Sequence, residues 1–358
     1  MRDKHIHIEQ ESALLKAIYR EVEEKLVIDK KLFRQQVWLK FAVYFSITGL
    51  LYYSLYRINN PVVFIAGFVA YGFSALLFAF NFSHDFSHNS VFKNKRANNF
   101  CFIAIYAIVG AHAEAWKQRH IKSHHYAPNV EGYDSDLGIS SLIRVIPGSR
   151  FCWFHRFQHL YAPLAYTSYS IFWIFIKDFI ILFSKDQYTE KKGFIYHISF
   201  WIQKMFYLTI ILVLPLIFTQ QPWYIVIAGF LLMQLLQSLF LLFTFFMTHH
   251  VEKTAYPTVD RDGYINSSWL MNQVKSSNDM HPFSETANFI LGGFNNHIAH
   301  HLFPHIHHIH YPRLNRILYG VLQEHGIIPN QTSYWGGIVS HMRLLKKMSR
   351  QTTGFQMG

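Results

Sequence analysis

Four long apolar segments constrain the fold of this 358-residue chain more than any other feature. A helix that crosses the hydrocarbon core of a bilayer needs about 20 mostly apolar residues. Buried helices of soluble proteins are normally shorter and amphipathic, so four such helices in a soluble core are not expected. We therefore predict an all-α, polytopic membrane protein with four spans in two hairpins. The four segments are residues 37–56 (with Lys40), 61–80, 199–218 (with Lys204) and 223–248.

The distribution of basic residues predicts the orientation. Of 33 lysines and arginines, only Arg57 lies in the two short turns that join the paired spans. The positive-inside rule then places both termini and the long middle segment in the cytoplasm, and we expect a bacterial inner membrane. Lys40 and Lys204 lie near cytoplasmic ends and are expected to snorkel toward water. The net charge of +12 fits an anionic membrane face and an acidic partner protein, so no nucleic acid is implied.

The remaining chain is predicted to lie on or near the cytoplasmic face. Residues 9–35 are predicted to form an amphipathic helix, either along the membrane surface or as a solvated charged helix. Residues 99–113 and 170–183 are apolar but too short to span, which favours interfacial or re-entrant segments. The chain thus divides into an N-terminal segment (1–36), a membrane domain (37–320) and a C-terminal tail (321–358).

Three groups of closely spaced histidines follow these segments, each at an inner span end or after an interfacial piece. Spacings of i, i+3 and i+4 place side chains on one face of a helix, and imidazole is a good ligand for iron, zinc and copper. His125 is rotated by about 100° from His124, so these neighbours could serve two different metal ions. A further pair, His249 and His250, ends the last span. The three groups are HDFSH (His84, His88), HIKSHH (His120, His124, His125) and HIAHH (His297, His300, His301).

These three motifs resemble the histidine boxes of the membrane fatty acid desaturases, in order and approximate separation. The resemblance covers residues 40–320 and is greatest to the acyl-lipid and linoleoyl-CoA desaturase-like branch. The flanking stretches NVEGYDSD, HHLFPHIHHIHYPRL and FFMTHHVE are also similar to that branch. Two features differ from many front-end members: His297 stands where they have glutamine, and no cytochrome b5-like haem segment is present.

The resemblance implies a cytoplasm-facing centre of two non-haem iron ions. Dioxygen would be a co-substrate, and electrons would come from a separate ferredoxin-like or cytochrome b5-like donor. The substrate would be a fatty acyl chain carried by lipid, coenzyme A or a carrier protein, in a tunnel between the apolar helices. Gly67 and Gly72 could leave room beside that chain, or could serve helix packing. The implied iron ligands are His84, His88, His120, His124, His125, His249, His297, His300 and His301.

Polar residues near the boxes are candidates to orient the ligands. Asp85, Asp134, Asp136 and Glu252 could accept the second ring N–H of a ligating histidine, or could be solvated or helix-capping. Glu252 lies at i+3 from His249 and i+2 from His250, which favours His249 over His250 as a ligand. Asn295 and Asn296 could hold a metal-bound water. His305, His307, His308 and His310 are predicted to support the site or contact lipid headgroups, and the other histidines are expected to be ordinary.

Two other function classes compete with desaturation. A related di-iron hydroxylase or ketolase of an alkane, sterol or carotenoid would use the same boxes, and only the flanking stretches favour the desaturase. A metal transporter with a histidine-rich loop is the third candidate. Transporters place polar ligands at mid-membrane in broken helices, and the four predicted spans carry no such ligands.

Overall fold

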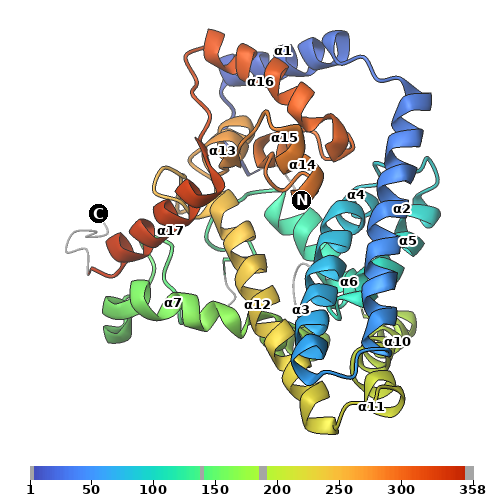
Figure 1. The fold of residues 1–358 in the computed structure, drawn as a ribbon. Coiled ribbons are helices and arrows are strands. Elements are labelled where there is room, and N and C mark those ends of the chain that lie inside the picture. The colour runs from blue at the N-terminus through green and yellow to red at the C-terminus, as the bar shows by residue number, and fades with distance from the viewer. Residues whose placement is uncertain (1–3, 138–140, 185–191, 351–358) are drawn as a thin grey trace.

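A computed structural model describes residues 4–137, 141–184 and 192–350, and helices make up most of this part of the chain (Figure 1). One short parallel pair of strands, β1 (Asp279–Met280) and β2 (Gln331–Thr332), joins two loops near the C-terminal helices. The predicted all-α class is therefore confirmed, whereas the number of membrane spans is a finer question.

Within the described part of the chain, three continuous helical runs are long and apolar enough to cross a membrane. These runs overlap three of the four predicted spans. The remaining predicted span, residues 37–56, corresponds to the long helix α2 (Lys30–Leu55). This helix packs on α3 but is not one of the three runs that are apolar enough to cross a membrane. Local signals place the helix starts, because Asp29 caps α2 and Asn60 caps α3 just before a proline. The runs are α3 (Pro61–Phe78) with the π-helical η1 (Ala79–Ser83) and α4 (His84–Ser87); α10 (Phe194–Leu208) with η5 (Thr209–Val213) and α11 (Leu214–Phe218); and α12 (Trp223–His249).

Two shorter apolar segments form bent helix pairs, each of the kind produced by a broken span or a re-entrant loop. The first pair bends by 114° and the second by 64°. Both contain a segment that was predicted to be interfacial or re-entrant. The first pair consists of α5 (Lys95–Ile108) and α6 (Ala113–Arg119) with η2 (His120–His124). The second consists of η3 (Trp153–Phe157) and α7 (Gln158–Thr167), then α8 (Tyr169–Phe172), η4 (Trp173–Lys177) and α9 (Asp178–Phe183).

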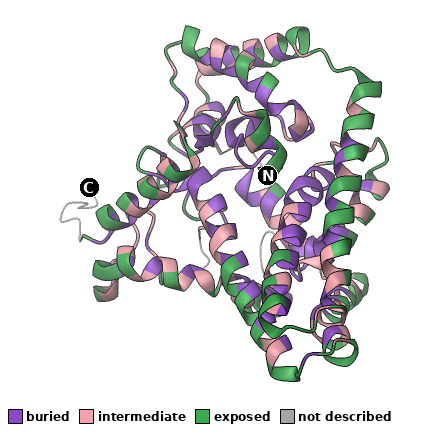
Figure 2. Cartoon of the chain, in the orientation of Figure 1, coloured by how far each residue is buried: buried purple, intermediate pink, exposed green. Residues whose placement is uncertain are grey.

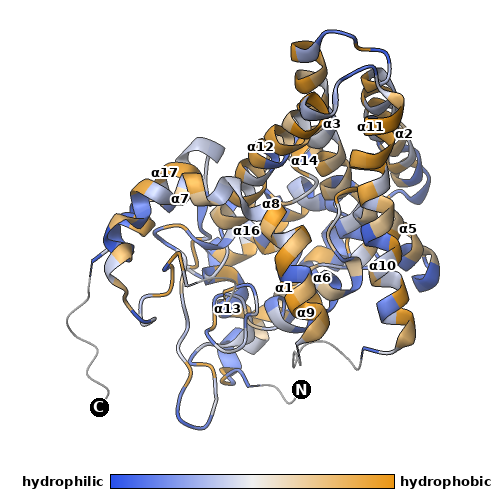
Figure 3. Cartoon of the chain, turned by 90° about the horizontal axis from the view of Figure 1, so that it is seen from below, coloured by the Kyte–Doolittle hydropathy of each residue, from blue (hydrophilic) through white to orange (hydrophobic). Residues whose placement is uncertain are grey.

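The C-terminal helices form a compact group at one end of the long helices, shown at the top of Figure 1. Most residues of α15 and its surroundings are buried, whereas the long helices expose apolar side chains over much of their surface (Figures 2 and 3). The group contains α13 (Trp269–Lys275), α14 (Glu285–Leu291), α15 (His297–Leu302), η6 (His308–His310) and α16 (Tyr311–Glu324). The last helix, α17 (Tyr334–Met348), packs instead on α12 and α7, at the left of Figure 1.

The N-terminal helix belongs to this C-terminal group. The predicted helix over residues 9–35 is divided into α1 (Glu9–Lys25) and the start of α2. The apolar stripe Leu14, Ile18 and Val22 is buried in one core with residues of α16. The stripe therefore covers protein, and both predictions for this helix, membrane surface and solvated helix, were wrong for its apolar face.

The packing corrects the expectation for two lysines and decides between the two alternatives for Gly67 and Gly72. Lys40 and Lys204 do not snorkel: both are buried, Lys40 donating to His308 Nε2 (2.8 Å) and Lys204 pairing with Asp178 (2.6 Å). Their partners lie far away in the sequence, so hydropathy alone could not find them. Gly67 and Gly72 serve helix packing, because an added Cβ would lie 3.3 Å or less from Leu55 and Ile58, or 2.2 Å from Met233.

Candidate metal centre

The box histidines are carried by short helical elements at the ends of longer ones. His84 begins α4, directly after a π-helical turn, and His88 is the residue that ends it. His120 and His124 lie in η2, which is also π-helical, and His249 ends α12. Such π-turns change the angular spacing of side chains and often mark functional sites.

One group of box histidines, the first cluster, gathers side chains from α4, η2 and α15. One ring nitrogen from each of its four members lies within 4.8 Å of the others. His125 adjoins this group, because its Nε2 lies 2.8 Å from His300 Nε2 and 3.1 Å from His120 Nε2. The four members are His84, His88, His120 and His300.

The second cluster gathers ring nitrogens of His124, His249, His297 and His301, again within 4.8 Å of one another. Helix α15 therefore serves both clusters: His297 and His301, at i and i+4, face the second, and His300 faces the first. The sequence suggested that the three histidines of this box point the same way. The structure instead divides them between the two clusters. The prediction that His124 and His125 serve different sites agrees with this geometry.

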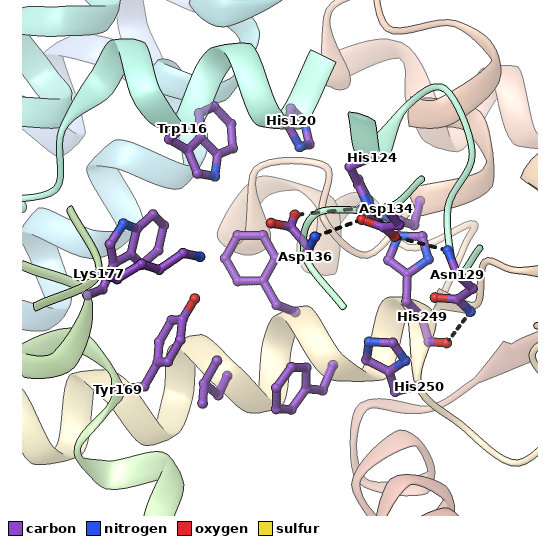
Figure 4. A pocket seen from close by; sticks show the side chains of 15 residues that line it. Trp116, His120, His124, Asn129, Asp134, Asp136, Tyr169, Lys177, His249 and His250 are labelled. Atoms are coloured by element: carbon purple, nitrogen blue, oxygen red, sulfur yellow. Dashed lines mark hydrogen bonds and ion pairs between the residues drawn. The ribbon is translucent and has the colours of Figure 1, made fainter. Parts of the chain in front are cut away.

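The histidines of the second cluster are oriented by acceptors at Nδ1. Asp134 Oδ2 lies 3.0 Å from Nδ1 of His124, the carbonyl of Ser276 lies 2.9 Å from that of His249, and Gln273 Oε1 lies 2.7 Å from that of His301. Each acceptor places the proton on Nδ1 and leaves Nε2 free to ligate. Figure 4 shows Asp134 beside His124. It also shows His249 and its neighbour His250, which is not a member of either cluster, at the end of α12.

Several buried ring nitrogens in both clusters have no hydrogen-bond partner among the residues that the structure describes. Buried polar atoms are nearly always paired, so such a group of orphaned ring nitrogens requires an explanation. A bound metal ion supplies one, because each neutral Nε2 offers a lone pair toward a shared centre. The orphaned atoms are Nε2 of His88, His249 and His301, and both ring nitrogens of His297.

The electrostatics favour the neutral imidazole at every cluster histidine except His124. Burial lowers the pKa of His297, His300 and His301 well below the usual value, and neighbouring histidines lower it further. Burial alone would raise the pKa of Asp134, but the facing His124 and the amides of Asp136 and Asn129 lower it overall. At His124, burial lowers the pKa, but the charge of Asp134 and its hydrogen bond to Nδ1 raise the pKa overall. Neutral imidazoles suit a transition-metal site, and a carboxylate at Nδ1 orients such a ring.

The other polar candidates are placed differently from expectation. Asp136 lies 4.0 Å from His124 Nδ1 and donates its amide to Asp134, so it supports the same corner. Asp85 accepts from Nδ1 of His308 and contacts no box histidine through a hydrogen bond in the described residues. Glu252 does not bond His249, because the carbonyl oxygen of Ser276 already accepts from His249 Nδ1. The Glu252 side chain is exposed, and its Oε2 lies 3.9 Å from Nη1 of Arg343.

The two asparagines before the third box lie in an amide network. Asn296 donates to Asn288 and accepts from Asn315, so its side chain faces the helices behind α15. Asn295 Oδ1 is buried without a partner. His250, as predicted, belongs to neither cluster; its Nδ1 lies 2.9 Å from the Tyr256 hydroxyl.

Sequence reasoning missed the groups that support α15. Asp279 is fully buried and accepts from the amide of Ile298 (2.9 Å) and the hydroxyl of Tyr319 (3.0 Å). Burial raises the pKa of Asp279 to about 7, although these hydrogen bonds act in the opposite direction. No spacing rule connects Asp279 or Gln273 with a histidine box, because the contacts depend on tertiary folding.

Three pockets adjoin one another, and two of them reach the clusters. The central pocket is lined by His120, His124, His249 and His297, together with aromatic side chains (Figure 4). An inner pocket beside His84 is almost wholly apolar, and an outer pocket lies between α7, α8 and α12. Adjacent, mostly apolar pockets suit a long apolar molecule whose middle passes the histidines.

Comparison with known proteins agrees with this geometry. The Fatty acid desaturase family matches residues 59–333. An sn-1 linoleoyl-lipid 6-desaturase of Arthrospira platensis is 30% identical over 295 residues, covering 80% of this chain and 78% of the relative. The corresponding Synechocystis enzyme is 27% identical, covering 81% and 82%. An acyl-lipid (8-3)-desaturase of Physcomitrium patens is 29% identical, and there the match covers 77% of this chain but 58% of the relative. This chain belongs to the fatty acid desaturase family.

Proposed function

We propose that this chain desaturates lipid-linked fatty acyl chains with dioxygen, two iron ions and electrons from a separate donor. The two histidine clusters at the junction of the pockets carry the proposal. Family membership makes the protein a fatty acid desaturase and favours this reaction over hydroxylation, ketone formation or metal transport. The lipid-linked carrier is suggested by the printed names of the Arthrospira and Physcomitrium relatives.

The ligand assignment follows the two clusters. One iron ion would be held by the first cluster together with His125, and the other by the second cluster. Asp134, Gln273 and the Ser276 carbonyl would fix the tautomers of the second cluster. When bound, the ions supply the redox chemistry that activates dioxygen. The first set is His84, His88, His120, His125 and His300; the second is His124, His249, His297 and His301.

The protein itself positions the acyl chain and excludes water from the reaction centre. The aromatic and aliphatic walls exclude water from the centre, and they hold an acyl chain beside the histidines without hydrogen bonds. Removing hydrogen from an unactivated methylene demands a strong oxidant, so exclusion of water and of other reductants protects the reaction.

The membrane arrangement in this proposal has four spans, with the centre on the cytoplasmic side of a bacterial inner membrane. Its support is the basic distribution outside the two turns. The helix α2 would be the first span, with Asp29 and Lys30 at its cytoplasmic end.

An acidic electron carrier, such as a ferredoxin-like protein, is the proposed partner. Exposed basic residues lie close in sequence to two boxes: Lys93, Lys95 and Arg96 follow the first, and Arg313 and Arg316 follow the third. Electrostatic docking would make turnover fall as salt rises when the donor is below saturation. Turnover that does not change with ionic strength would contradict this docking.

The proposed reaction is tested by expressing the chain in a host whose fatty acids are known. Mass spectrometry of the methyl esters should show a new double bond and no hydroxylated product, and the purified protein should contain about two irons per chain. The double variant His124→Ala/His301→Ala should yield no product, whereas His325→Ala, at an exposed histidine, should match the parent. A hydroxylated product, or full activity with one zinc per chain, would refute the proposal.

A further inference from the structure

Three aromatic side chains stand where the central and inner pockets meet. Trp116, Trp173 and Phe245 line both pockets. We call this group the aromatic neck. An acyl chain that passes from one pocket to the other must pass between these rings, so the neck lies beside the carbon atoms that react.

Two walls of the neck are attached to the histidines. The ring of Trp116 stacks on His120 with centroids 4.4 Å apart. Phe245 packs against Phe294 at 4.8 Å, and Phe294 in turn lies 4.5 Å from His84. The positions of Trp116 and Phe245 are therefore coupled to those of the proposed metal ligands.

The third wall, Trp173, is fixed from outside the metal centre. Its ring packs against Tyr106 and Tyr169, and its indole N–H donates to Asp178 Oδ1 at 3.1 Å. The other oxygen of Asp178 accepts from Lys204 Nζ at 2.6 Å. The Asp178 and Lys204 side chains are both buried.

The same charged pair also fixes the bend that leads to the second box. Asp178 Oδ2 accepts from the backbone N–H of His112 (2.7 Å), and Lys204 Nζ donates to the carbonyl of Gly110 (2.7 Å). Gly110 adopts a φ of +84°, and a Cβ there would lie 2.8 Å from the Tyr207 ring, so this turn requires glycine. The pair thus connects Trp173, the α5–α6 bend and α10.

A buried ion pair of this kind is a poor device for stability alone. Replacing such pairs by apolar side chains is often neutral or stabilising, because the charges must be desolvated. A positional role is a better physical reason for it here. An acyl chain offers no hydrogen-bonding groups, so its register is set by the shape of its tunnel, and a misplacement of about 1 Å can cost about 100-fold in rate.

We propose that Asp178 and Lys204 are positioning residues that hold Trp173 in the neck and thereby set which carbon atoms face the histidine clusters. The inference rests on the proposed desaturation and adds a determinant of double-bond position. Asp178 acts through Trp173, and Lys204 acts through Asp178.

The first test is Trp173→Phe, which keeps an aromatic ring, loses the indole N–H and leaves the ion pair intact. The matched control is Trp201→Phe on α10, where the tryptophan is 48% exposed. Double-bond positions in the products are measured by mass spectrometry, with iron per chain measured in parallel. Trp173→Phe should raise the ratio of positional isomers to the parent product at least tenfold at unchanged iron content, and Trp201→Phe should leave the ratio unchanged.

A second variant, Asp178→Asn/Lys204→Met, removes both charges together. The amide offers one acceptor oxygen where the carboxylate offers two, so Trp173 and His112 would compete for it. This variant should also give mixed isomers. If either the Trp173 variant or the double variant forms product with a single, parental double-bond position, the inference is overturned. A failure of the underlying proposal is distinguishable, because the parent itself would then form no new double bond.

Discussion

The two histidine clusters are similar in composition and different in how they are held. In the second cluster, three imidazoles donate to acceptors on other elements, namely Asp134, Gln273 and the Ser276 carbonyl. In the first cluster, the contacts among the described residues run mainly between imidazoles, as between His84 and His120 (3.3 Å). The hydroxyl of Tyr311, 3.4 Å from His300 Nδ1, is a long contact by comparison.

The two clusters therefore differ in whether the protein orients the imidazoles before a metal ion binds. The second cluster is preorganised by the protein, so its ring nitrogens converge before a metal ion binds. Convergence in the first cluster depends on packing and on the ion itself. We therefore expect the second cluster to bind metal more tightly and to be more sensitive to changes in its acceptors.

The largest effect is expected from His249→Ala, which removes a proposed ligand from the preorganised cluster. Turnover should be abolished and iron per chain should fall, because the second cluster then keeps only three of its four converging ring nitrogens. His250→Ala is the matched control, since His250 bonds Tyr256 and belongs to neither cluster. Iron content and product yield, measured at equal expression, show which of the two histidines is a ligand. If His250→Ala were inactive and His249→Ala active, His250 would be the ligand in place of His249.

Asp279→Ala should affect both clusters together, because α15 carries ligands for both. The change leaves buried hydrogen-bond donors of Ile298 and Tyr319 unpaired, which should cost about 2 to 4 kcal/mol of stability. The expected result is a lower Tm and parallel loss of both irons. Loss of a single iron at unchanged Tm would contradict a shared support.

Asp134→Asn should distinguish the clusters. The amide keeps the size of the side chain but no longer offers an ionised acceptor to His124, and such changes weaken metal binding by about 10- to 100-fold. A chelator titration followed by iron analysis should then show one iron released earlier than in the parent, with the other unchanged. Equal weakening of both irons would mean that the clusters are not independently held.

The identity of the box histidines could be predicted from sequence, because i and i+4 spacing is a property of a single helix. Their division between two clusters could not. In η2 the π-helical turn separates His120 from His124, and α15 directs His300 away from His297 and His301. The first effect is a departure from regular helix geometry. The second is ordinary geometry, since adjacent residues of an α-helix point about 100° apart, and the tertiary fold decides which cluster each one faces.

The supporting groups were predicted less well, for a different reason. Asp134 lies ten residues from His124 and was found because it follows the box closely. Glu252 was chosen on the assumption that α12 continues regularly, but the helix ends at His249 and the chain turns away. Gln273, Asp279 and the pairing of Lys204 with Asp178 depend on elements brought together only by the tertiary fold.

The smallest effect is expected from Tyr311→Phe, which removes the hydroxyl that contacts His300 Nδ1 in the first cluster. Because the hydroxyl lies 3.4 Å from His300 Nδ1, it contributes little orientation, and turnover should fall less than about threefold. Iron content should be unchanged, in contrast to Asp134→Asn at the second cluster. The same chelator titration measures both variants side by side. If Tyr311→Phe released an iron as readily as Asp134→Asn, the first cluster would also be held by its surroundings, and the difference between the two clusters would disappear.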